Sequence, residues 1–335
     1  MILIIQLLNQ ALGEWEKIHP HRVKPLTLDY LIQSRDHIIV FWFEIGSKTK
    51  QPILISKIPR TEQFNYYIER SVKLVDSLRR NLKPPIKETI PYRVFAGRVN
   101  ELSHIVMGVL PGEPINIPAD NILGRRAVER HLSAFLSWLI EFQSQSMIGH
   151  QTYNALDWEE FFEQQRINAI SDISQDDQYQ LLSKEISDRL STRTIPSGWG
   201  YGDAHHSNIL IDGNRISGVI DWIGVQENQW FYIDWYYFIF SYAIQFYKKN
   251  LKTDIDSQCK LAISTTMGIT DHWLTELFQG KTRQFLAHYS FTPDLSPELF
   301  LTFLHGLHWP NNKALLIQDA YQTYSSIITT RDPEI

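Results

Sequence analysis

The hydrophobic pattern divides the chain into a strand-rich first third and a helical remainder. Residues 37–45, 52–58 and 105–110 are runs of β-branched and aromatic side chains, a composition typical of strands. A glycine-containing turn at 46–48 separates the first two runs. Residues 62–81 carry apolar side chains at helical spacing, which predicts one helix between the second and third strands.

Beyond residue 110 the pattern becomes mainly helical. An apolar stripe over 128–142 predicts one long helix, residues 158–170 predict another, and most of the chain after Ile233 has helical character. Two short apolar stretches, 209–211 and 219–220, interrupt this pattern. An Asp-Gly-Asn turn joins them, so they are expected to form a β-hairpin.

Polar residues around this hairpin have the spacing used in phosphoryl transfer. Asp203 and Asn208 lie just before its first strand, and Asp221 follows its second strand. Asp-x-x-x-x-Asn is the second half of the kinase catalytic-loop pattern, and a later Asp supplies a metal ligand. Asp203 could accept a hydroxyl proton, while Asn208 and Asp221 offer the oxygen ligands that Mg²⁺ prefers. Turn formation could explain any one of them alone, but the combination favours catalysis.

These features predict an α+β, bilobal, protein-kinase-like fold. Residues 1–108 are expected to form a small β-rich nucleotide-binding lobe, and residues 109–115 are expected to form a Pro- and Gly-containing hinge. Residues 116–335 are then the larger, mainly helical lobe, which contains the catalytic loop and the acceptor site.

The predicted strand at 52–58 carries the candidate phosphate-binding residue, Lys57. Strand alternation places Ile53, Ile55 and Lys57 on one face. Lys57 could therefore reach the α- and β-phosphates while Ile55 covers the adenine. Glu69, on the following helix, is the expected ion-pair partner of Lys57, with Glu62 as the second choice. A solvated surface position remains the alternative for Glu69.

The adenine is expected to meet the hinge side of this lobe. Met107 and Val109 are the candidates to contact it through hinge backbone groups. Residues 33–36 stand where a phosphate-covering loop is expected, but they contain no glycine, and the sequence has no Gly-x-x-x-x-Gly-Lys loop. The pattern does not distinguish ATP from GTP.

Two further motifs allow more than one interpretation. His205 and His206 could join Asp203 and Asp221 in a hydrolytic metal centre, but adjacent residues of an extended segment point to opposite sides. No further His or Cys completes a ligand spacing of that kind. The aromatic run at 230–240 could be a wall that stacks on a sugar or a cation. Its unbroken apolar character favours a buried helix instead.

The residues 201–210, followed by 218–222, resemble the aminoglycoside phosphotransferase family, which looks related to choline and homoserine kinases. The resemblance extends to 54–60, 107–114 and Asp234, and covers about 60% to 70% of the chain. It implies a small-molecule kinase that uses Mg²⁺ and ATP or GTP. It also implies that Asp234 braces the catalytic loop without taking part in the chemistry.

The chain departs from the family pattern at two positions. Tyr201 replaces the usual His, and Ile223 stands where Glu or Gly is common. Neither change removes a proposed ligand, but both put a specific antibiotic-resistance role in doubt.

Composition excludes several classes of partner. The net charge of −5 is spread over both signs, so no basic footprint for nucleic acid is visible. Residues 1–8 are apolar but short and lack a basic flank, so a packed helix is expected there rather than a targeting signal. No stretch approaches the roughly 18 to 20 apolar residues that span a bilayer. The single cysteine, Cys259, fits a reducing compartment. We therefore expect a cytoplasmic monomer or homodimer.

The predicted function is transfer of the γ-phosphoryl group of ATP or GTP to a small-molecule hydroxyl, with Asp203 as the base. A metabolite, a sugar, an aminoglycoside-like compound or a natural product could be the acceptor. Protein phosphorylation is less favoured, because no Asp-Phe-Gly to Ala-Pro-Glu segment occurs. The alternative is a catalytically silent, nucleotide-binding pseudokinase or regulatory protein, which the glycine-free segment at 33–36 mildly favours.

Overall fold

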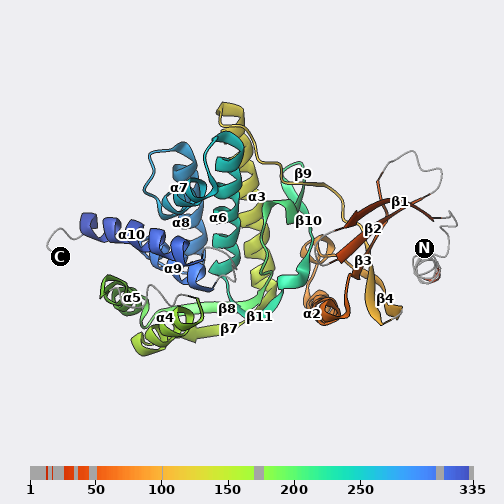
Figure 1. The fold of residues 1–335 in the computed structure, drawn as a ribbon, viewed down its shortest axis with the longest axis horizontal. Coiled ribbons are helices and arrows are strands. Elements are labelled where there is room, and N and C mark those ends of the chain that lie inside the picture. The colour runs from red at the N-terminus through yellow and green to blue at the C-terminus, as the bar shows by residue number, and fades with distance from the viewer. Residues whose placement is uncertain are drawn as a thin grey trace. The chain divides into compact units, whose positions relative to one another are not determined.

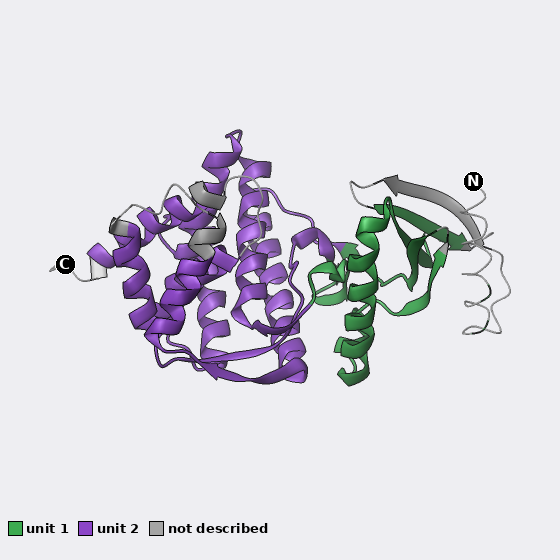
Figure 2. Ribbon diagram, turned by 60° about the horizontal axis from the view of Figure 1, so that its bottom comes forward, with its two compact units in different colours: residues 1–113, 209–225 green, residues 114–208, 226–335 purple. Residues whose placement is uncertain are grey.

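The computed structural model has an α+β fold (Figure 1). It describes Gly13, Lys17 and residues 26–33, 37–44, 51–99, 101–169, 177–306 and 313–331. The expected N-terminal helix, the turn at 46–48 and residues 34–36 of the expected phosphate loop lie outside these ranges. The chain forms two compact units (Figure 2): the first comprises residues 1–113 with 209–225, and the second comprises residues 114–208 with 226–335.

The first unit is built on a five-stranded sheet in which neighbouring strands pair antiparallel in the order β1-β2-β3-β5-β4. Its strands are β1 (Leu26–Gln33), β2 (His37–Glu44), β3 (Leu54–Pro59), β4 (Arg93–Val99) and β5 (Leu102–Gly108). The three strands predicted from the hydrophobic runs are confirmed as β2, β3 and β5. Val40, Trp42 and Leu54 are buried in a core on one face of this sheet.

The opposite face of the sheet packs against one helix. α2 (Asn65–Asn81) follows the short 3₁₀ turn η1 (Glu62–Phe64), so the helix predicted over 62–81 is confirmed. Ile68 and Val72, one turn apart on α2, pack against Ile105 of β5. A second 3₁₀ turn, η2 (Ile86–Thr89), leads from α2 to β4.

The predicted hairpin is present as β9 (Ile209–Asp212) and β10 (Arg215–Val219), which pair antiparallel. Gly213, with φ of +60°, adopts the left-handed conformation that the turn requires. Ser217 Oγ donates a hydrogen bond to the Pro111 carbonyl at 2.7 Å, and a Cβ at position 218 would lie 2.8 Å from Leu110. These close contacts explain why the hairpin groups with the first unit, whereas the sequence analysis places it in the helical lobe.

The second unit is mainly helical. Its helices are α3 (Ile122–Ser146), α4 (Ala155–Ala169), α5 (Asp177–Leu190), α6 (Tyr232–Asn250), α7 (Ile255–Met267), α8 (Trp273–His288), α9 (Ser296–Gly306) and α10 (Lys313–Arg331). A three-stranded antiparallel sheet has the order β11-β8-β7. Its strands are β7 (Met147–Thr152), β8 (Thr194–Gly200) and β11 (Gln226–Trp230). The remaining short elements are η4 (His206–Asn208), η5 (Trp222–Gly224), η6 (Pro293–Leu295) and the two-residue strand β6 (Glu113–Pro114), where the first unit gives way to the second.

The aromatic run before and within α6 forms part of the core. Trp235 and Phe238 are fully buried, and the ring of Phe238 stacks on Phe135 of α3 with centroids 3.9 Å apart. Trp235 also stacks on Phe285 of α8. The interpretation of this run as a buried helix is therefore confirmed for most of its residues.

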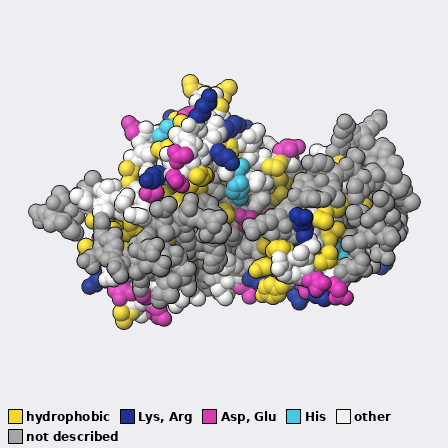
Figure 3. Space-filling model, in the orientation of Figure 1, with side chains coloured by type: hydrophobic (Ala, Val, Ile, Leu, Met, Phe, Trp, Pro, Cys, Tyr) yellow, Lys and Arg dark blue, Asp and Glu magenta, His cyan; other side chains and the backbone are white. Residues whose placement is uncertain are grey.

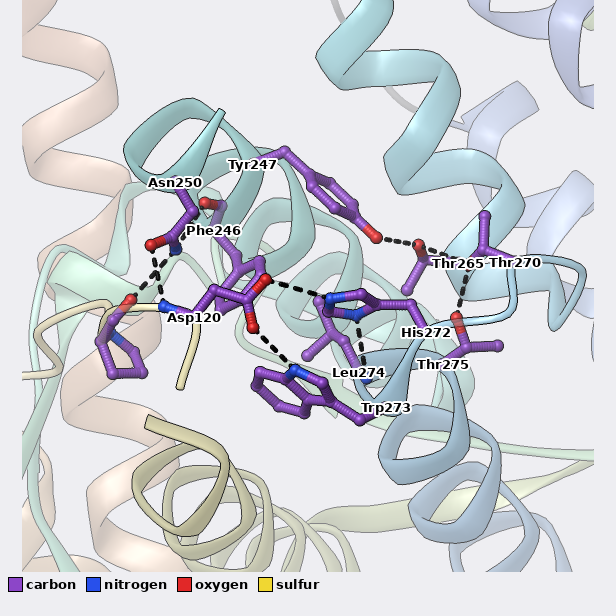
Figure 4. Close-up of polar contacts among 11 residues, drawn as sticks. Asp120, Phe246, Tyr247, Asn250, Thr265, Thr270, His272, Trp273, Leu274 and Thr275 are labelled. Carbon is purple, nitrogen blue, oxygen red and sulfur yellow. Dashed lines mark hydrogen bonds and ion pairs between the residues drawn. The ribbon is translucent and has the colours of Figure 1, made fainter. Parts of the chain in front are cut away.

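A polar network joins the segment before α3 to α6 and α8 (Figure 4). The Asp120 carboxylate accepts a hydrogen bond from Trp273 Nε1 at 2.7 Å and lies 3.2 Å from His272 Nε2. The Asp120 backbone N–H donates to Asn250 Oδ1 at 2.9 Å. Next to it, Asn121 Oδ1 caps the first turn of α3. The segment just before α3 is thus held through both the carboxylate and the backbone N–H of Asp120.

The surface carries charges of both signs. On the face shown in Figure 3, basic and acidic side chains of the described residues are interspersed and form no single large patch. In the described part of the chain, no helix combines the length and the apolar character needed to cross a membrane.

Candidate functional site

The loop between β8 and β9, residues 201–208, is held by a buried carboxylate. Asp234 lies in the first turn of α6 and is fully buried. Its two oxygens accept hydrogen bonds from the backbone N–H groups of Tyr201 and Gly202, each at 2.8 Å. Burial raises the pKa of Asp234, and these two bonds oppose that rise. Gly202 has a φ of +79°, which glycine adopts without strain. The bracing role that the resemblance implies for Asp234 agrees with this geometry.

Asp203 occupies the middle of a small hydrogen-bond network. Its Oδ2 accepts a bond from Asn208 Nδ2 at 2.8 Å, and its Oδ1 accepts one from the Tyr237 hydroxyl at 2.9 Å. The structure therefore brings together the two loop residues that the sequence singled out. Because the Asn208 amide nitrogen faces Asp203, the Asn208 amide oxygen remains for another ligand.

Tyr237 is a site residue that the sequence analysis missed. It follows Asp234 by three positions on α6, so both side chains lie on the face of the helix that meets the loop. Burial raises the pKa of the Tyr237 hydroxyl well above its usual range, and the neighbouring Asp203 charge raises it further. Tyr237 is therefore a permanent donor to Asp203 at physiological pH. The i, i+3 spacing from Asp234 was the available signal.

The two histidines of the loop are neutral. Burial lowers the pKa of His206 to about 4, and it also lowers the pKa of His205. His205 Nδ1 lies 2.8 Å from Ser207 Oγ, a contact that fixes the ring within the loop. Among the residues that the structure describes, no group of three or more His, Cys, Asp or Glu side chains could hold a metal ion.

In the first unit, Lys57 and Asp221 form an ion pair. Lys57 Nζ, from β3, lies 2.7 Å from Asp221 Oδ1, at the end of β10. Asp221 has φ and ψ of 61° and 60°, a left-handed conformation that is uncommon for residues other than glycine. After it, the Trp222 indole donates to the Val219 carbonyl at 2.8 Å and anchors the turn. The structure thus brings together two more of the predicted residues.

The expected ion pair between Lys57 and Glu69 is not formed. Glu69 accepts hydrogen bonds from Arg98 at 2.7 Å and from the Ser103 hydroxyl, and both bonds lower its pKa. Successive side chains on a helix are about 100° apart, and Glu69, next to Ile68 on α2, reaches Arg98 of β4 and Ser103 of β5 instead of Lys57. The second choice, Glu62, is exposed. The carboxylate partner of Lys57 is Asp221.

A small cavity of the first unit, with a volume of about 40 Å³ and partly open to solvent, adjoins this ion pair. Met107, Ile105 and apolar residues of α2 line it together with Lys57 and Asp221. Ile55 pairs with Met107 in the register of β3 and β5.

Val109 has one backbone group already in use. Its N–H donates to the Ile53 carbonyl at 3.2 Å. Of the hinge groups expected to face adenine, Val109 could therefore offer only its carbonyl.

Comparison with known proteins identifies the family. Residues 48–226 match APH, the phosphotransferase enzyme family, and this range contains Lys57, Asp203, Asn208 and Asp221. No curated protein matches the chain. Among solved structures, the chain is similar to a thermostable mutant of aminoglycoside phosphotransferase APH(4)-Ia in its apo form, with 12% identity and a TM-score of 0.49, over 95% of this chain and 98% of that one.

Two further solved structures show the same degree of likeness. ADP-bound aminoglycoside phosphotransferase APH(2'')-Ib is 13% identical, over 93% of this chain and 97% of that one, with a TM-score of 0.49. Macrolide 2'-phosphotransferase MphH from Brachybacterium faecium is 13% identical, over 94% and 97%, with a TM-score of 0.45. Because the family match spans more than half of the 335 residues, the chain belongs to the APH phosphotransferase enzyme family and is a phosphotransferase.

Proposed function

We propose that the protein transfers the γ-phosphoryl group of ATP or GTP to a hydroxyl of a small molecule, with Asp203 as the base. The observation that carries the proposal is the hydrogen bond between Asp203 and Asn208 in a loop that Asp234 holds rigidly. Phosphoryl transfer depends mainly on positioning and charge stabilisation, so a fixed carboxylate beside the acceptor is the central requirement.

Asp203 would accept the acceptor proton as the hydroxyl oxygen attacks the γ-phosphorus. Both of its oxygens already receive hydrogen bonds, from Tyr237 and from Asn208. These donors fix the direction of the carboxylate before the acceptor arrives. Asp203 is therefore preorganised for the proposed step.

Asn208 and Asp221 would hold Mg²⁺. The Asn208 amide oxygen is directed away from Asp203, and only Oδ1 of Asp221 is used by Lys57. One amide oxygen and one carboxylate oxygen, completed by phosphate oxygens and water, match the preference of Mg²⁺ for hard ligands. When bound, this ion would neutralise charge on the phosphates.

Lys57 would bind the α- and β-phosphates. Its ammonium group is paired with Asp221 at 2.7 Å, so phosphate oxygens would compete with, or share, this partner. Ile55 and Met107 provide apolar surface next to Lys57 for the base. In this proposal the first unit binds the nucleotide, and the second supplies the base and the acceptor site.

The test compares Asp203→Asn and Asp221→Ala with the wild type in two measurements. Acceptor-dependent release of ADP or GDP should fall by about 10²- to 10⁴-fold in Asp203→Asn, the range for loss of a general base. Thermal melts should show that this variant still binds MgATP or MgGTP. Nucleotide at a hundred times its Kd should stabilise the protein by about 2.7 kcal/mol. In Asp221→Ala the Mg²⁺-dependent part of this stabilisation should disappear.

Asp212→Asn is the matched control, because Asp212 lies on the same hairpin but is exposed at its turn. It should behave as the wild type in both assays. Asp203→Asn with more than about a tenth of wild-type turnover would remove Asp203 from the role of base. Nucleotide binding without turnover of any acceptor would favour the alternative, a catalytically silent nucleotide-binding protein.

A further inference from the structure

The second unit contains a cavity along one face of α6. Five residues of this helix line it at positions i, i+3, i+4, i+7 and i+8, together with His205 of the loop and Phe303 of α9. The five are Tyr237, Phe240, Ser241, Ile244 and Gln245. The cavity has a volume of about 220 Å³ and is partly open to solvent.

The cavity reaches the proposed base through Tyr237. The ring of Tyr237 lines the cavity, and its hydroxyl donates to Asp203 Oδ1 at 2.9 Å. His205, at the same end, is two residues from Asp203 in the loop. A molecule in this cavity would therefore lie beside the carboxylate that accepts the hydroxyl proton.

The lining combines an apolar wall with a few polar side chains and carries no acidic or basic Asp, Glu, Lys or Arg among the described residues. Phe240, Ile244 and Phe303 provide the apolar wall. Away from Asp203, a polycation would lose hydration along this wall without meeting a carboxylate of the described lining residues, which is unfavourable.

The polar groups of the cavity suit a neutral ligand. The half-buried amide of Gln245 can both donate and accept hydrogen bonds, at the end of the lining away from Tyr237. Lys248 follows Gln245 by three residues, on the same face of α6, and is exposed. Its positive charge also disfavours a cationic ligand. A ligand with an apolar body could pack on Phe240, Ile244 and Phe303, and an uncharged polar substituent could bond to the Gln245 amide.

We propose that this cavity is the acceptor subsite, and that the acceptor is an uncharged molecule with an apolar ring or chain and a free hydroxyl. The proposal rests on the proposed function. The apolar body packs on Phe240, Ile244 and Phe303, and Gln245 bonds a polar substituent. The hydroxyl proton passes to Asp203 while the hydroxyl oxygen bonds to the γ-phosphorus. The bond from that phosphorus to the β,γ-bridging oxygen breaks, and the nucleoside diphosphate leaves with its electron pair.

Binding without nucleotide tests the cavity independently of catalysis. Calorimetry on the full chain would compare three neutral probes, methyl, phenyl and octyl β-D-glucoside, with the polycation kanamycin. We expect phenyl or octyl glucoside to bind at least ten times more tightly than methyl glucoside and than kanamycin. Equal affinity along the glucoside series, preference for kanamycin, or binding of none of the four would each overturn the proposal.

Gln245→Glu places a charge in the cavity with almost no change of shape. We expect it to shift the ratio of kanamycin to phenyl glucoside affinity by at least tenfold toward kanamycin. Gln284→Glu, at an exposed position of α8 in the same unit, makes the same change of charge outside the cavity and should leave the ratio unchanged. An equal shift in both variants would show a general charge effect and overturn the assignment of the cavity.

The same probes separate failure of this proposal from failure of the proposed function. Nucleotide-dependent transfer to kanamycin alone would keep the function and overturn the neutral acceptor. If nucleotide fails to bind, but the glucosides discriminate and Gln245→Glu responds as expected, the neutral cavity is supported while the phosphotransfer proposal fails.

Discussion

Asp203 depends on its neighbours, because a catalytic carboxylate must point in one direction before the acceptor arrives. The Asn208 amide holds one of its oxygens from within the loop, and the Tyr237 hydroxyl holds the other from α6. Two elements that are distant in sequence therefore orient a single side chain. This arrangement makes Tyr237 a positioning residue, whose removal should affect the chemical step more than binding.

Tyr237→Phe removes only the hydroxyl that donates to Asp203. We expect kcat to fall about tenfold, since one charge-assisted hydrogen bond contributes about 1.5–3 kcal/mol and part of the orientation remains with Asn208. The KM for nucleotide should stay within about twofold of the wild-type value, because Tyr237 lies in the second unit and the proposed nucleotide-binding residues lie in the first. Steady-state kinetics with nucleotide and acceptor varied separately would measure both.

Tyr236→Phe is the control for this prediction. The Tyr236 hydroxyl is buried one position earlier on α6 and donates to the Ser296 carbonyl at 2.9 Å, away from Asp203. Its removal could lower stability, but the folded variant should keep its kcat. A similar loss of kcat in both variants would mean that α6 packing, rather than the bond to Asp203, controls turnover.

Several site residues could be predicted from sequence because their spacing encodes their position. Asp203 and Asn208 share one short loop, so a five-residue separation brings them together. The partner of Lys57 could not be predicted in this way. It depends on which sheet residues lie next to Glu69 of α2, and these are Arg98 of β4 and Ser103 of β5, which bind it.

At the scale of elements, the first turn of α6 supports the loop that carries Asp203. Asp234→Asn would place an amide NH₂ against one of the two backbone N–H donors, of Tyr201 or Gly202. A buried donor left without an acceptor costs about 1–3 kcal/mol, so we expect the free energy of unfolding to fall by about that amount. kcat should fall as well, because the loop is no longer held at both N–H groups. Urea unfolding and steady-state kinetics would measure the two effects.

Asp254→Asn provides the control for the same chemical change. Asp254 is the exposed N-cap of α7, and Asn is an equally good N-cap residue. We expect its stability and its kcat to stay close to the wild-type values. An Asp234→Asn variant as stable and active as Asp254→Asn would show that the loop is held by other contacts.

The sequence predicted the elements that have a strong hydrophobic period and missed the sheet of the second unit. β2, β3, α2 and the hairpin all follow from apolar spacing or from turn residues. β8 contains Gly198 and Gly200, which weaken a strand signal. A Cβ at position 198 would lie 2.4 Å from the Ser146 carbonyl oxygen, and one at 200 would lie 2.1 Å from the Gln229 side chain. Tight packing between strands therefore requires the small residues that hide β8 from sequence analysis.

At the scale of the whole molecule, each unit carries half of the proposed chemistry. Lys57 and Asp221 meet in the first unit, and Asp203 and Asn208 meet in the second. The chain enters the first unit a second time to form the hairpin that precedes Asp221. The lobe boundaries at 108 and 116 stay a prediction. Their sequence basis was the Pro and Gly content of the hinge, which gives no signal for a returning hairpin.

Each unit also buries a neutral histidine, so both units are expected to lose stability as the pH falls. His104 lies on β5 in the first unit and His131 on α3 in the second, with 1% and 5% of their surfaces exposed. Burial lowers the pKa of each ring to about 4, against an ordinary value near 6.5. As pH falls below about 6.5, the unfolded chain binds protons at these rings while the folded chain does not. The free energy of unfolding must therefore decrease from about pH 6.5 down to about pH 4.

From pH 7.5 to pH 5.0, each ring should account for a loss of about 2 kcal/mol in the free energy of unfolding. His104→Phe and His131→Gln remove the titrating ring from one unit each, and each should reduce the pH-dependent loss by about that amount. His150→Gln, at an exposed position, should leave it unchanged. Urea unfolding of the four proteins at both pH values would measure these differences. If neither buried-ring variant flattens the pH dependence, the rings bind protons in the folded chain, and acid lability must come from other groups in both units.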